Sequence, residues 1–128
     1  RTSSDDSNSS FGRTVHGISL TSSRDLLYVG DRDNKRFQVF RPDGTFVRER
    51  SAPEVWDFSF SADEAQTYMF VTEGGMRTVR IYARDTLQEL GTFGGHLTAD
   101  NWQPGSFAGY VHSIATDSQG SLYVTEIG

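Results

Sequence analysis

The sequence predicts an all-β protein built from a repeated unit. Short apolar stretches of strand length alternate with polar turns along the chain. Three of these stretches open alike, and each is followed by an aromatic residue and a valine: VHGISL, VWDFSF and VHSIAT, starting at Val15, Val55 and Val111. Val55 follows Val15, and Phe70 follows Tyr28, at nearly equal intervals along the chain. Both intervals agree with a period of about 40 to 45 residues and four short strands per unit, which is typical of a β-propeller blade.

The chain is therefore predicted to be a β-propeller segment of about two and a half four-stranded blades. A sandwich of two antiparallel sheets would also contain many short strands. It gives no reason, however, for the same opening to recur at the start of each unit. Because an incomplete ring of blades exposes strand edges, we also expect self-association through open blade edges.

The first blade is expected over residues 14–51. Its strands are indicated by apolar alternation at Ile18 and Leu20 and by the stretches at 26–29, 37–40 and 45–48. Pro42-Asp43-Gly44 stands before the last stretch, where proline fixes φ and glycine supplies the positive φ of a tight hairpin turn. The four strands are predicted to form one antiparallel meander.

The same apolar stretches and turn residues divide the rest of the chain into units. A second blade is expected over residues 52–95, and residues 110–128 supply the inner half of a third blade. Residues 96–109, rich in Gly, Pro and polar side chains, are predicted to form a surface excursion that helps to build a binding surface. Residues 1–13, mostly Ser- and Asp-rich without periodicity, are predicted to be a flexible linker.

Composition restricts the partners. With 12 basic and 17 acidic residues the formal net charge is −5, so the chain lacks the basic field that attracts nucleic acid, and no nucleic-acid partner is expected. The absence of cysteine excludes disulfides and thiol chemistry but leaves the compartment open. No apolar run approaches the length of a membrane span.

The segment LLYVGDRDNKRFQVFRPDGTFV resembles the NHL-repeat β-propellers, which include six-bladed bacterial proteins. In the NHL pattern an aromatic-valine strand leads to Ala/Gly-Asp, a polar corner with Asn and Arg, an apolar strand and Pro-Asp-Gly. The resemblance covers about residues 12–128. NHL propellers serve as scaffolds, as protein or RNA binders and as enzymes, so the resemblance implies the fold more strongly than a function. It slightly favours a secreted or periplasmic location.

A narrower resemblance is to the peptidyl-α-hydroxyglycine α-amidating lyases. In that family, histidines at the starts of innermost strands in different blades bind zinc in the central channel. His16 and His112 occupy this position here, with a blade that lacks this histidine between them. The resemblance implies that both are zinc ligands and that Arg32, in the Gly-Asp-Arg-Asp-Asn corner, is the active-site arginine. A third histidine, a further arginine and the catalytic tyrosine of the family have no counterpart here, and Ser113 stands where an aspartate commonly follows the last histidine.

Each of these residues also has a structural interpretation. His16 and His112 can be channel-lining residues bonded to backbone or water, and Arg32 can stiffen its corner through a salt bridge with Asp31 or Asp33. Trp56, which replaces histidine in the second blade, is expected to fill or wall the channel. His96 is expected at the surface, and Trp102 is expected to be a lid over the channel mouth or a plug against a neighbouring blade.

Two functions follow from these patterns. The first is a binding scaffold whose propeller face takes a protein, peptide or small-molecule ligand, with a metal site in the channel. The alternative is a zinc-dependent lyase that resembles the amidating enzymes, in which Arg32 would hold a substrate carboxylate. A third class, RNA binding, is disfavoured by the net charge of −5.

Overall fold

The computed structural model describes residues 10–96 and 103–128, and within these ranges every regular element is a β-strand. The first sheet contains β1 (Val15–Leu20), β2 (Leu27–Asp31), β3 (Arg36–Phe40) and β4 (Phe46–Ser51). The second contains β5 (Asp57–Phe60), β6 (Tyr68–Glu73), β7 (Thr78–Ala83) and β8 (Gln88–Gly94). A third, two-stranded sheet pairs β9 (Tyr110–Thr116) with β10 (Leu122–Ile127).

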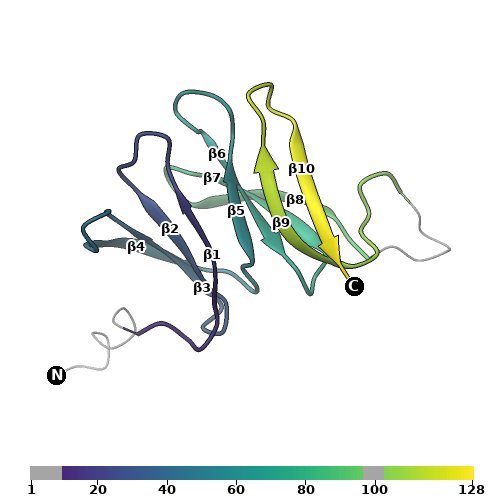
Figure 1. Cartoon of the computed structure of the whole chain (residues 1–128), viewed down its shortest axis with the longest axis horizontal. Coiled ribbons are helices and arrows are strands. Elements are labelled where there is room, and N and C mark those ends of the chain that lie inside the picture. Colours follow the sequence, from purple (N-terminus) through teal and green to yellow (C-terminus); the bar gives the residue numbers. More distant parts are fainter. Residues whose placement is uncertain (1–9, 97–102) are drawn as a thin grey trace.

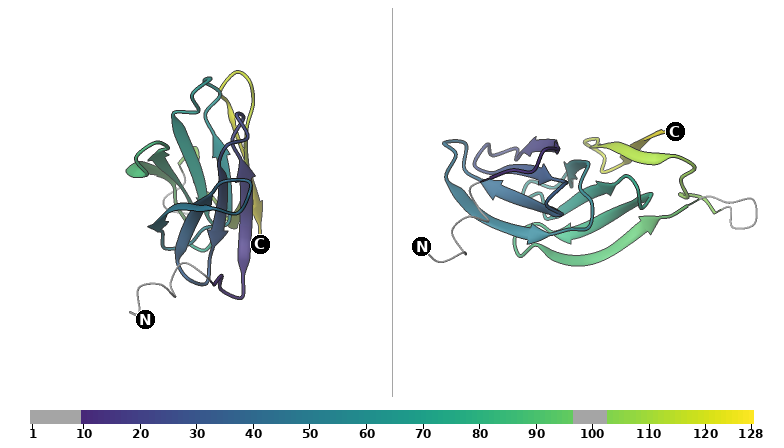
Figure 2. Two further views of the ribbon diagram at one scale, coloured as in Figure 1. Left: turned by 90° about the vertical axis from the view of Figure 1, so that its left-hand side faces the viewer. Right: turned by 90° about the horizontal axis from the view of Figure 1, so that it is seen from below.

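The sheets are antiparallel meanders in which each strand pairs with the next along the chain. Figures 1 and 2 show the three sheets side by side in chain order, with β1, β5 and β9 as neighbours. This arrangement confirms the predicted fold class: two four-stranded blades and the inner two strands of a third form a partial β-propeller. No helix in the described part of the chain is long and apolar enough to cross a membrane.

The repeat extends to local backbone geometry. The second and third strands of the first sheet, β2 and β3, correspond to β6 and β7 of the second sheet. Each residue of β2 and β3 lies the same number of residues before its equivalent in β6 and β7. Both sheets have a register shift at the same place, between Val39 and Phe40 and between Ile81 and Tyr82. The matching turns place Lys35 and Arg77 at positive φ, 51° and 58°. The predicted Pro42-Asp43-Gly44 turn is present, with Gly44 at φ 88°.

Apolar side chains fill the spaces between neighbouring sheets. Between the first and second sheets, the Phe37 ring meets those of Phe58 and Tyr82 edge-on, with centroids 5.8 and 5.4 Å apart. Between the second and third, Val79 packs with Val111 and Ile114. Burial of these faces supplies the main stabilising term, and it fixes the inner strands side by side.

The expected linker at residues 1–13 lies largely outside the described residues. Its last part has no strand but is attached to the first sheet: the Gly12 N–H donates to Asp31 Oδ1 at 2.8 Å, and the Ser10 carbonyl accepts from Arg36. These contacts place the entrance to β1 beside the corner between β2 and β3.

Candidate functional site

Three equivalent residues meet at the start of the inner strands. His16 lies in β1, Trp56 immediately precedes β5 and His112 lies in β9, each one residue after the valine that opens its unit. The ring centroids are 5.0 Å apart for His16 and Trp56, 5.3 Å for the two histidines and 5.4 Å for Trp56 and His112. Packing of three blades thus brings together side chains that come from three separate repeats of the sequence.

Two further side chains complete this group. The Arg32 guanidinium lies over the Trp56 ring, with Cζ 5.0 Å from the centroid. The Tyr110 ring is nearly parallel to the Trp56 ring, at 8° and 6.0 Å between centroids. We call these five residues the Trp56 cluster: His16, Arg32, Trp56, Tyr110 and His112. Tyr110 was not predicted from the sequence; its only signal is its place immediately before the third repeat of the valine opening.

Backbone contacts fix the orientation of the rings. Trp56 N–H donates to the Thr72 carbonyl at 2.9 Å, and the Trp56 carbonyl lies 2.7 Å from His16 Nδ1. The Trp56 ring occupies the space above Gly74, where an added Cβ would come within 2.3 Å of Trp56 Cε2. A glycine is therefore required at the β6–β7 corner if the ring is to lie there.

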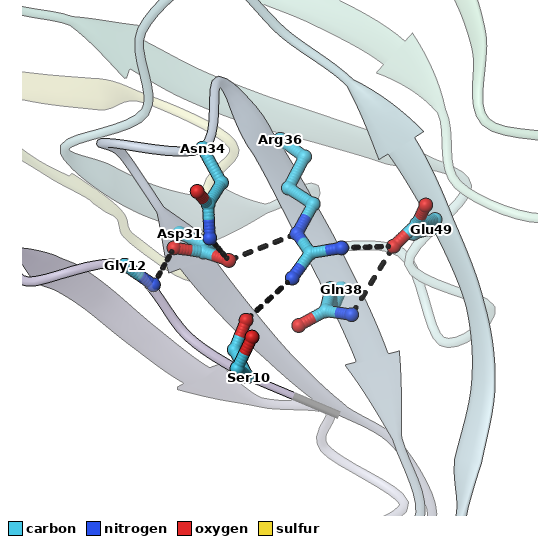
Figure 3. A network of polar contacts seen from close by, with 7 residues as sticks. All are labelled: Ser10, Gly12, Asp31, Asn34, Arg36, Gln38 and Glu49. Atoms are coloured by element: carbon cyan, nitrogen blue, oxygen red, sulfur yellow. Dashed lines mark hydrogen bonds and ion pairs between the residues drawn. The ribbon is translucent and has the colours of Figure 1, made fainter. Parts of the chain in front are cut away.

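A buried network holds the corner that carries Arg32. Asp31 is fully buried at the end of β2, and its carboxylate accepts from Arg36 Nε at 2.8 Å and from the Asn34 side chain at 2.9 Å (Figure 3). Arg36 also pairs with Glu49 at 3.0 Å. Burial tends to raise the pKa of Asp31, but hydrogen bonds from Asn34, Gly12 and Arg36 hold it below its ordinary value. The acid stays charged, and the corner is rigid.

The structure shows Arg32 on an aromatic ring and not in the salt bridge that was considered for it. Asp31 is engaged by Arg36, and the Asp33 carboxylate accepts the Thr14 N–H at 2.9 Å. Within residues 10–96 and 103–128, Arg32 makes no ion pair with a carboxylate. A cation over a tryptophan face is held electrostatically but is not neutralised. No carboxylate of the described residues engages the guanidinium donors, so they can bind an anion.

The histidine pair supplies two donors of the type that zinc prefers. A carbonyl oxygen can only accept, so the contact with Trp56 makes His16 Nδ1 the donor, and in the neutral tautomer with this proton Nε2 carries the lone pair. This arrangement is common in metal-binding histidines. A catalytic zinc site needs about three protein ligands, and the described residues contain no group of three His, Cys, Asp or Glu side chains that could hold a metal. The pair alone does not complete such a site.

The surface excursion contains His96 and, by sequence, Trp102. His96 is exposed and forms an isolated parallel bridge with Phe107. Trp102 lies outside the described residues. None of the described residues of the excursion belongs to the Trp56 cluster; Tyr110 follows the excursion and begins β9.

Comparison with protein-family models and with curated proteins finds no match to this sequence. Among solved structures the chain is similar to Kuenenia stuttgartiensis hydrazine synthase, a protein that contains a β-propeller. The TM-score is 0.70 at 11% identity, and the match covers 94% of this chain and 32% of that chain. This chain thus spans about a third of the length of the protein it matches. At this identity the likeness shows the fold alone, and the fold is a β-propeller.

Proposed function

We propose that this chain is an NHL-type propeller segment that binds a ligand at the Trp56 cluster, with Arg32 as the contact for a carboxylate group. The ligand is a peptide, a protein terminus or a small molecule. The observation that carries the proposal is the meeting of side chains from three blades at one end of the inner strands, with a guanidinium that has no carboxylate partner among the described residues.

The chemistry of the cluster favours such a ligand. Two aromatic rings and two imidazoles provide flat surface for an apolar or planar group, and the guanidinium fork matches the two oxygens of a carboxylate. Trp56 Nε1 is buried and has no hydrogen-bond acceptor among the described residues. Because buried donors are rarely left unpaired, this N–H supports a ligand that presents an acceptor to it.

The test uses N-acetylglycine, a minimal peptide carboxylate, as the probe. The chain has two tryptophans, so a Trp102→Phe background lets fluorescence report on Trp56 alone. We expect saturable quenching whose dissociation constant rises about tenfold in Arg32→Gln, since one charge-assisted contact is lost. Arg41→Gln, on the exposed β3–β4 hairpin, is the matched control and should bind as the background does. Equal affinity in the two variants would contradict the role of Arg32.

A second function, a zinc-dependent lyase, is favoured by one observation: His16 and His112 are adjacent, and the Nδ1 contact of His16 leaves its Nε2 available. The third ligand would have to come from outside the described residues. Zinc titration by calorimetry should show binding that is weakened by His16→Ala and by His112→Ala. His96→Ala, which removes the third histidine of the chain, should leave it unchanged. Equal effects of all three substitutions would rule out a shared site.

A further inference from the structure

Arg77 extends the Trp56 cluster beyond the residues used so far. It lies in the turn between β6 and β7, and its Cζ is 5.7 Å from the centroid of the Tyr110 ring. Since Tyr110 stacks on Trp56 and Arg32 lies over Trp56, the four side chains form one continuous run. Its order is Arg32, Trp56, Tyr110 and Arg77, with a guanidinium at each end and two stacked rings between them.

The two end residues differ from two arginines inside the sheets. Arg36 and Arg80 pair with the buried carboxylates of Asp31 and Glu73. Neither Arg32 nor Arg77 makes an ion pair with a carboxylate in the part of the chain that the structure describes. Arg77 Nη1 is also buried there without a hydrogen-bond acceptor. Arg50 also lies over a ring without a described ion pair, but that ring, Tyr82, is buried in the core. Arg32 and Arg77 instead belong to a run of side chains that includes the exposed Tyr110, and in a chain of net charge −5 this pair of arginines favours a site for negative groups.

We propose that Arg77 is a second anion-binding residue of this site and that the ligand carries two acidic groups separated by roughly the span of the two stacked rings. This inference rests on the proposed function, because it needs the first acidic group to bind at Arg32. The class of ligand is then an elongated dicarboxylate, such as a peptide with one acidic side chain and a free carboxyl terminus. The rings between the arginines would contact the apolar spacer of such a ligand.

The backbone fixes the position of Arg77 independently of its side chain. The residue has φ 58°, its N–H donates to the Gly74 carbonyl at 3.0 Å and its carbonyl accepts from Gly95 at 2.7 Å. Lys35 is the equivalent residue in the first blade, with φ 51° and an N–H bond to the Arg32 carbonyl at 2.9 Å. Glutamine is tolerated at positive φ in this chain, as Gln66 at φ 48° shows. Arg77→Gln and Lys35→Gln therefore remove the same charge from equivalent turns.

The test compares straight-chain dicarboxylates, from adipate to tetradecanedioate, with the monocarboxylate of each length. Binding is followed by Trp56 fluorescence in the Trp102→Phe background. We expect one dicarboxylate length to bind about tenfold more tightly than its monocarboxylate, as one added charge-assisted contact would give. Arg77→Gln should reduce that ratio to about twofold or less with little effect on the monocarboxylate. Lys35→Gln should preserve the ratio.

The outcomes separate the inference from the function on which it rests. If N-acetylglycine binds through Arg32 but no dicarboxylate exceeds its monocarboxylate, the role of Arg77 is wrong and the proposed function stands. The inference also fails if Arg77→Gln and Lys35→Gln reduce the ratio equally, because the effect is then one of net charge. If none of the carboxylates binds saturably, both proposals fail. Far-ultraviolet circular dichroism confirms that each variant keeps its sheets.

Discussion

The position of the Trp56 ring depends on Gly74, and this dependence can be tested by adding one methyl group. In Gly74→Ala the new Cβ would lie 2.3 Å from Trp56 Cε2 and 2.5 Å from Cδ2, so the ring must move. At the next position, Gly75→Ala, the nearest atom is Glu54 Oε2 at 2.7 Å, the end of a flexible side chain that can turn away. The two substitutions share a corner but meet very different neighbours.

Their difference isolates the effect of the clash. Both variants gain about 0.4 to 1 kcal/mol because alanine restricts the unfolded chain. Overpacking a rigid ring costs about 1 to 3 kcal/mol, so the free energy of unfolding should be lower in Gly74→Ala than in Gly75→Ala by that amount. Urea denaturation followed by far-ultraviolet circular dichroism measures this difference, and near-ultraviolet circular dichroism reports the displaced ring.

A second background shows whether the cost comes from the ring itself. With Trp56→Leu already present, the smaller side chain leaves room for the alanine, and the difference between the Gly74 and Gly75 variants should fall to within about 0.5 kcal/mol. Ligand affinity should likewise fall in Gly74→Ala and not in Gly75→Ala. If Gly74→Ala and Gly75→Ala are equally stable in the chain that keeps Trp56, the described position of the ring is wrong.

Three further outcomes are expected from the same structure. Arg80→Met should lower the free energy of unfolding by about 3 to 5 kcal/mol, because it leaves the fully buried Glu73 without its positively charged partner. Arg41→Met at the surface should change it by about 0.5 kcal/mol or less, and denaturant titration compares the two variants. Hydrogen bonds from Ser61 and Thr67 lower the pKa of Asp63 from 3.8 to about 2. Asp63→Asn should therefore be less stable than wild type at neutral pH, and the difference in stability should shrink as pH falls from about 4 to 2. Thermal melts at each pH measure this difference. Ile18, 61% exposed on the open face of β1, should promote self-association, and light scattering should show less of it in Ile18→Asp.

Much of the fold could be predicted because the repeat is visible in the sequence. Strand alternation, the Pro42-Asp43-Gly44 turn and the recurring valine openings each reflect one local physical requirement. Once the units are known to be equivalent, the equal placement of His16 and His112 on inner strands follows from the symmetry of blade packing. The structure places them in direct contact, with centroids 5.3 Å apart.

The contacts of the site could not be predicted in the same way, because they depend on distances between blades. The sequence places Arg32 between Asp31 and Asp33, and this spacing favours a local salt bridge. In the structure Asp31 is buried and bonded to Arg36 instead, and Arg32 contacts a tryptophan of the next blade. Tyr110 was missed for the same reason, since its parallel contact with Trp56 joins two different blades.

The two complete blades also show how one backbone can vary the partners of a buried acid. Asp31 lies opposite Arg36 and bonds to it directly. In the second blade the acid is Glu73, the residue opposite is Thr78, and the arginine is Arg80 on the same face two positions further along β7. The longer glutamate side chain reaches both, with Thr78 Oγ1 at 2.8 Å and Arg80 Nε at 2.7 Å. The buried charge is balanced in each blade, although by a residue at a different position.

This balance matters for the site because each buried acid is followed directly by a residue that touches Trp56. Arg32 follows Asp31, and Gly74 follows Glu73 at the equivalent position of the second blade. The first blade thus places a guanidinium over the Trp56 ring, while the second leaves the space into which the ring fits. Both corners are held by buried ion pairs, and the ring lies between them. Loosening either acid should therefore disturb ligand binding at Trp56 even though neither carboxylate belongs to the Trp56 cluster.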